Sequence, residues 1–182
     1  MPNSKKFIEK KKEEMLYAAF FISQINQANN WDYVMVSNEN EMSEDCDVDV
    51  FAKSKKLPTL NLQLKNIDTE HKYRGILRAR EAENNSDGES VVQIRDLDSI
   101  SWIKEAVDRC TLQYEKPRKC NIVLLLHVYH VNKIDEEYAR KEFTQYQQSD
   151  FKAIYFVNPF GTTQDGQIID GQLLAIKALP KN

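Results

Sequence analysis

The segment DVDVFAKSKKLPTLNLQLK (residues 47–65) contains two alternating runs, separated by a turn that carries lysines and a proline. Alternation of apolar and polar residues is typical of β-strands, because successive side chains point to opposite faces. The polar face of the first run carries Asp47 and Asp49, and that of the second carries Gln63 and Lys65. The segment therefore predicts a hairpin with acidic, amide and amine groups on one face.

Hydrophobic periodicity around this hairpin predicts an α/β fold with a mixed central β-sheet flanked by helices. Helical spacing of apolar residues is found over residues 4–29, 98–115 and 135–148. Strands are predicted at residues 31–37, 47–53, 59–67, 91–96, 121–129, 151–159 and 167–179. The run NIVLLLHVY (121–129) is almost continuously apolar, which is typical of a central strand buried on both faces. We expect one domain over residues 1–182.

The composition indicates a globular protein, with 41% hydrophobic and 29% charged residues. The net charge of −3 gives no global attraction to nucleic acid, so such binding would require a local basic patch. The three cysteines lack metal-site spacing, which favours a reducing compartment. The N-terminus is charged and lacks a signal sequence, and the apolar run at 122–128 is too short to cross a bilayer. These features predict a cytoplasmic protein with no membrane partner.

The polar residues of the hairpin suit the binding of a divalent cation and a phosphate. The Asp49 carboxylate and the Gln63 side-chain oxygen are the hard ligands that Mg²⁺ prefers, and the Leu64 carbonyl would add a third oxygen. Lys65 would orient or deprotonate a metal-bound water and help to neutralise a phosphate. A metal ion lowers the pKa of bound water and stabilises negative charge in the transition state. The set predicts phosphodiester hydrolysis that depends on Mg²⁺ or Mn²⁺.

An N-terminal helix, a strand with an aspartate, a turn and a strand ending in Gln-x-Lys resemble the PD-(D/E)xK nuclease superfamily. QLK (63–65) is similar to the QxK variant of Mrr-like restriction endonucleases, and DCDVDV (45–50) resembles the segment that precedes it. The resemblance covers residues 5–66 and implies a restriction-endonuclease-like core that cleaves DNA. The sequence departs from the family pattern because no proline precedes the aspartate and Gln replaces the commoner Glu. A neutral amide holds a divalent cation less strongly than a carboxylate does.

By this resemblance, Asp49 is the metal-binding acid, Gln63 occupies the second ligand position and Lys65 is the catalytic lysine. A glutamate of the first helix often completes such sites. Glu13 and Glu14 both fit by spacing, and the sequence leaves both open.

Further candidates lie next to these residues. Asp47 shares a strand face with Asp49 and is a reserve metal ligand. The basic run HKYRGILRAR (71–80) follows the motif directly and would line a groove that meets phosphates. Its candidate DNA contacts are Lys72, Arg74, Arg78 and Arg80. The alternative is a solvated helix face, which the neighbouring acids at 81–83 favour.

Two other functions compete with an active endonuclease. The acidic pI and the Gln at the ligand position favour a catalytically inactive interaction or nucleic-acid-binding module, of the kind found in prokaryotic defence or mobile-element systems. The third alternative has no site, and it predicts that Asp49 and Lys65 point into bulk solvent. An active enzyme would suit a homodimer, since two sites cut both strands, and a protein partner that supplies specificity. His127 is interpreted as a satisfied core histidine.

Overall fold

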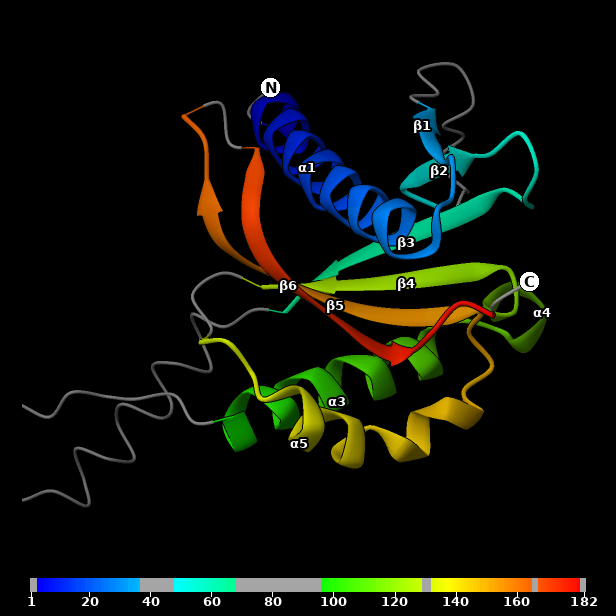
Figure 1. The fold of residues 1–182 in the computed structure, drawn as a ribbon, viewed down its shortest axis with the longest axis vertical. Coiled ribbons are helices and arrows are strands. Elements are labelled where there is room, and N and C mark those ends of the chain that lie inside the picture. The colour runs from blue at the N-terminus through cyan, green and yellow to red at the C-terminus, as the bar shows by residue number, and fades with distance from the viewer. Residues whose placement is uncertain (1–2, 37–47, 68–95, 129–131, 165–166, 181–182) are drawn as a thin grey trace, which may run out of the picture.

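The structure is a computed structural model of the chain, and it is an α/β fold built on a curled mixed sheet (Figure 1). It describes residues 3–36, 48–67, 96–128, 132–164 and 167–180. The helices are α1 (Asn3–Asn29), α3 (Asp96–Gln113), α4 (Lys116–Lys119), α5 (Glu136–Glu142) and the 3-10 helix η1 (Thr144–Gln148). The strands are β1 (Val34–Val36), β2 (Val50–Lys53), β3 (Leu60–Asn66), β4 (Ile122–His127), β5 (Ala153–Thr162) and β6 (Ile168–Lys177).

The six described strands lie in the sheet in the order in which they occur along the chain. β1, β2 and β3 are antiparallel neighbours, and Val50 lies opposite Leu62. β3, β4 and β5 are parallel, and Leu62 lies opposite Val123. β6 pairs with β5 in the antiparallel sense. The carboxyl ends of β3, β4 and β5 therefore share one edge of the sheet.

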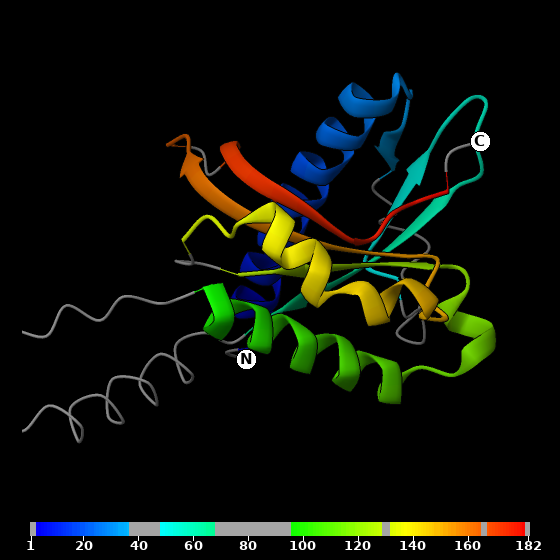
Figure 2. The same ribbon diagram turned by 60° about the horizontal axis from the view of Figure 1, so that its bottom comes forward.

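Helices cover both faces of the sheet and bury two separate cores (Figures 1 and 2). α1 packs on the face that carries Leu62 and Leu64 of β3 and Leu125 of β4. α3 and α5 pack on the opposite face, which carries Leu124 and Leu126. All six residues of β4 are buried, which confirms the predicted central strand. Burial of each such side chain contributes roughly 1.5–3 kcal/mol.

Several element boundaries differ from the sequence prediction. α3 begins at Asp96, two residues before the start of the helix predicted at 98–115. The helix predicted at 135–148 keeps its Asp135 cap, whose carboxylate accepts a hydrogen bond from the Tyr138 amide at 2.7 Å. It then narrows at Phe143 into a 3-10 helix. The tighter winding places residues three apart on one side of the helix, and the buried Phe143 and Tyr146 both enter the core.

Two segments expected to separate regular elements carry more regular structure than the sequence indicated. KPRK (116–119) is the short helix α4, started by a proline in its first turn. The turn predicted in GTTQDG (161–166) starts later than expected, because β5 continues through Gly161 to Thr162 with local register shifts against β6. The Thr163 amide then donates to the Gln167 carbonyl oxygen at 2.9 Å. Residues 91–95 of the strand predicted at 91–96 lie outside the described residues. Among the described helices, none is both long and apolar enough to span a membrane.

Candidate functional site

Asp49 lies immediately before β2, beside the carboxyl-terminal part of β3. Its backbone amide donates to the Leu62 carbonyl oxygen at 2.9 Å, which extends the β2–β3 ladder by one residue. One oxygen of its carboxylate accepts hydrogen bonds from the Gln63 side-chain amide and from the Leu64 backbone amide, the latter at 2.7 Å. The hairpin therefore brings together three of the residues that the motif selected.

The alternation along β3 separates its polar and apolar side chains, as the sequence predicts. Leu62 and Leu64 point into the core beneath α1. Gln63 is only 5% exposed and lies opposite Leu124 of β4. Lys65 is half-buried, and its ammonium lies 5.6 Å from the centre of the Tyr114 ring, just beyond α3. The polar face of β3 is therefore turned toward α3 and away from bulk solvent.

The carboxyl groups of Asp49 and Glu14 resist ionisation. Burial raises the pKa of Asp49, although the Leu64 hydrogen bond and the charge of Lys65 oppose the shift. Burial also raises the pKa of Glu14, which is 5% exposed, and the charge of Asp49 raises it further. The Lys10 ammonium, 3.4 Å from a Glu14 carboxylate oxygen, acts in the opposite direction. Two desolvated acids that repel each other form an environment that a divalent cation would stabilise.

Lys65 stays protonated at neutral pH. Burial lowers the pKa of its ammonium, but a hydrogen bond to Tyr114 and interactions with Cys110 and Asp49 outweigh burial, so the net shift is upward. A lysine with a raised pKa is a poor proton acceptor. The arrangement therefore favours charge neutralisation and orientation of a water by Lys65 over deprotonation of that water.

Glu13 and Glu14 diverge, although they are neighbours on α1. Glu14 interacts electrostatically with Asp49. One carboxylate oxygen of Glu13 lies 4.0 Å from Nδ1 of His127, the last residue of β4. The electrostatic interaction with Asp49 therefore favours Glu14 over Glu13 as the helix glutamate of the candidate site.

His127 is buried, as interpreted from the sequence, but its hydrogen bonding is incomplete. Its ring stacks on Tyr17 with 4.1 Å between centroids, and burial lowers its pKa to about 4. Its Nδ1 and the facing Glu13 oxygen are both buried, and neither has a hydrogen-bond partner among the described residues.

The sequence gave no indication of Lys10 or Tyr114 as neighbours of the candidate site. Lys10 lies one helical turn before Glu14, a spacing that would have identified it.

Among the described residues, no group of three or more His, Cys, Asp or Glu side chains could hold a metal ion. The available oxygens come from Asp49, Glu14 and Gln63. The Gln63 side-chain oxygen is buried and lacks a hydrogen-bond partner within the described part of the chain. A buried oxygen without a partner, on a side chain that also contacts a carboxylate, is compatible with a hard divalent cation.

The other predicted site residues cannot be placed. Asp47, Lys72, Arg74, Arg78 and Arg80 lie outside the described residues. The roles that the sequence suggested for them stay predictions.

Comparison with known proteins gives no relative from which a role could be transferred. The sequence matches no family model, no curated protein and no solved structure. The functional argument therefore rests on the residues of this chain.

Proposed function

We propose that this chain is a nuclease-like domain that hydrolyses DNA phosphodiester bonds with the help of Mg²⁺ or Mn²⁺. The observation that carries the proposal is the Asp49 carboxylate, which is held by Gln63 and Leu64 and whose charge raises the pKa of the buried Glu14. Lys65 supplies a positive charge on the same strand. Two acids, an amide oxygen and a lysine are the groups that metal-assisted phosphodiester hydrolysis requires.

The order of the elements supports the same proposal. α1 is followed by the antiparallel strands β1, β2 and β3, then by α3 and by β4, which runs parallel to β3. This order is compatible with the restriction-endonuclease-like core that the PD-(D/E)xK resemblance implies. Asp49 and Gln63 lie where β2 meets β3, and Glu14 lies on α1, which packs on the Leu62 and Leu64 face of β3.

Each residue would have a separate role in hydrolysis. Asp49 and Glu14 would bind the cation through carboxylate oxygens, and Gln63 and the Leu64 carbonyl would add neutral oxygens. The cation, when bound, activates a water and stabilises charge on the phosphate. Lys65 would hold a phosphate oxygen or the water by donating hydrogen bonds from its protonated ammonium.

One observation favours a second function, a catalytically inactive binding module. Asp49 and Gln63 are hydrogen-bonded to each other, and Lys65 is bonded to Tyr114. In such a module these contacts would join the hairpin to α3 without binding a metal. The two functions differ in whether the wild-type protein binds Mg²⁺ or Mn²⁺.

Cleavage by matched variants tests the proposal. Supercoiled plasmid is incubated with Mn²⁺ and with wild type, Lys65→Ala or Lys53→Ala, the last being an exposed lysine of the same hairpin. We expect Lys65→Ala to lose roughly 100-fold or more in rate, the typical cost of removing a group that stabilises the transition state. Lys53→Ala should cleave as wild type does. Unchanged cleavage by folded Lys65→Ala would contradict the proposal.

Calorimetric titration separates the two functions. Wild type should bind Mn²⁺, and Asp49→Asn should bind it much more weakly, because a charged ligand is lost. An absence of binding by wild type at millimolar metal would favour the inactive module.

A further inference from the structure

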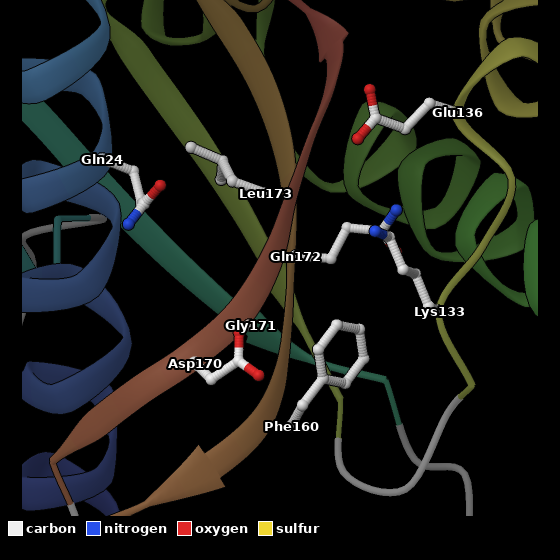
Figure 3. Close-up of a pocket in the computed structure, with 8 residues that line it drawn as sticks. All are labelled: Gln24, Lys133, Glu136, Phe160, Asp170, Gly171, Gln172 and Leu173. Atoms are coloured by element: carbon white, nitrogen blue, oxygen red, sulfur yellow. The ribbon is translucent and has the colours of Figure 1, made fainter.

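A pocket of about 390 Å³ lies along β6, the last of the described strands of the sheet (Figure 3). Its lining residues are Gln24, Lys133, Glu136, Phe160, Asp170, Gly171, Gln172 and Leu173. Gln24 and Leu173 lie on one side of β6, and Lys133, Glu136 and Phe160 lie on the other (Figure 3). The pocket therefore follows the edge of the sheet on both of its faces.

The edge of β6 has backbone groups that an added strand could use. β6 is the last of the described strands and pairs only with β5 among them. The Gln147 side-chain amide donates to the Ile176 carbonyl oxygen at 2.5 Å, so that carbonyl points away from β5. The Lys152 amide donates to the Ile122 carbonyl oxygen of β4, so by alternation along β5 Tyr155 and Val157 face β6, opposite Ala175 and Leu173. The backbone groups of Leu174 and Gln172, which alternate with these, therefore point outward. An extended segment of another protein can pair with such groups.

The side chains at this edge suit a flat cation. Phe160 is 42% exposed, and the Asp170 carboxylate points toward its ring (Figure 3). Asp170 is exposed, and Glu136 borders the same pocket. A guanidinium group stacks on aromatic rings and donates paired hydrogen bonds to carboxylates. An exposed aromatic ring beside an exposed acid is therefore suited to an arginine side chain.

The charges around the pocket favour a cationic ligand over a phosphate. A second pocket, of about 450 Å³, adjoins the first and is lined by Lys133, Ile134, Asp135, Glu136 and Glu137. Acids outnumber the lysine among the described residues that line the two pockets. Glu136 and Glu137 make exposed ion pairs within α5, at 3.7 and 3.0 Å, and such pairs are weak. A nucleic acid would meet net negative charge here.

We propose that the β6 edge binds an extended segment of a partner protein and that an arginine of this segment enters the pocket. The segment pairs with the outward backbone groups of Gln172 and Leu174. Its guanidinium stacks on Phe160 and donates hydrogen bonds to the Asp170 carboxylate. This surface is separate from the candidate metal site, so the inference does not depend on nuclease activity.

The probe for this surface is the capped peptide Thr-Val-Arg-Val-Thr, titrated into ¹⁵N-labelled full-length protein and followed by NMR. The matched ligand replaces Arg with citrulline, which keeps the shape and removes the charge. We expect the arginine peptide to shift the amide signals of Asp170, Gln172 and Leu174. We expect the dissociation constant of the citrulline peptide to be at least about tenfold higher. A factor of ten in affinity corresponds to the loss of one modest polar interaction, here the charged hydrogen bond to Asp170.

Two variants test the residues that form the pocket. Asp170→Asn and Phe160→Leu should each weaken the arginine peptide several-fold, and both changes lie at exposed positions that keep the fold. Asp150→Asn, an acid beside Lys116 and outside the pocket, should bind as wild type does. Equal binding of the two peptides, or unchanged binding by Asp170→Asn, would overturn the proposal. So would an absence of shifts at roughly millimolar peptide, or a single-stranded oligonucleotide that shifts the same amides.

Discussion

β3 and β4 are parallel neighbours with opposite characters. β4 is apolar except for its last residue and is buried on both faces. β3 has leucines on one face and places Gln63 and Lys65 on the other, beneath α3. Burying an amide and an ammonium costs free energy unless each finds partners. The comparison indicates that β4 stabilises the fold, and that β3 gives up apolar burial to hold polar groups together.

The largest effect is expected from β4. Leu124→Ala removes a fully buried side chain and should lower the free energy of unfolding by roughly 2–5 kcal/mol. Leu112→Ala, at a residue of α3 that is 89% exposed, is the control and should change it by less than about 0.5 kcal/mol. Urea denaturation measures both. A loss at Leu124 no larger than that at Leu112 would contradict the role assigned to β4.

The end of β4 should respond to acid. Burial lowers the pKa of His127 from 6.5 to about 4, so the folded state disfavours the protonated ring. Neutral His127 therefore contributes to the free energy of unfolding above pH 6.5, and this contribution is lost as the pH falls toward 4. At 1.36 kcal/mol per pKa unit, the loss is about 3 kcal/mol. His127→Leu should show a smaller loss of stability between pH 7 and 4 in urea titrations, and an unchanged loss would refute this assignment.

The polar face of β3 should be less sensitive than the core. Asp49→Ala leaves the Gln63 and Leu64 donors without their acceptor and should cost about 1–3 kcal/mol. Asp49→Asn keeps an oxygen acceptor and removes a desolvated charge, so it should lose no stability at neutral pH. Chemical denaturation measures the free energy of unfolding of both variants. Equal losses would show that the carboxylate does not stabilise the fold through these hydrogen bonds.

The smallest effect concerns the two acids together. Raised pKa values mean that Asp49 and Glu14 contribute stability when protonated, and that this contribution is lost as the pH rises through their folded-state pKa values. The double variant Asp49→Asn, Glu14→Gln should therefore gain stability relative to wild type at neutral pH. Mn²⁺ should raise the melting temperature of wild type at that pH and leave the double variant unchanged. A shift of equal size in both proteins would exclude these acids as the binding site.

The sequence predicted the features that depend on local pattern. The period of two placed Gln63 and Lys65 on one face, and the continuous apolar run identified β4. The sequence could not choose between Glu13 and Glu14, because consecutive residues of a helix differ only in direction, and packing sets the rotation of α1. The contact of Lys65 with Tyr114 joins distant parts of the chain and leaves no local pattern.

Other differences arose where tertiary packing overrode local preference. The segment around Gly161 has turn-forming residues, yet pairing with β6 extends β5 through it. The break at Phe143 is not marked by glycine or proline, and it follows from the burial of Phe143 and Tyr146 in one core.

The parallel pairing of β3 with β4 has a consequence for the order of folding. Asp49 and Gln63 belong to one hairpin, whereas Leu62 and Val123 are about 60 residues apart in the sequence. Contacts between distant residues form later, because a longer loop must close first. The Asp49–Gln63 contact is therefore expected to form early. The contact between Lys65 and Tyr114 is expected to form late. The Lys65 side chain would therefore take its final position in the candidate site only after the two halves of the sheet have docked.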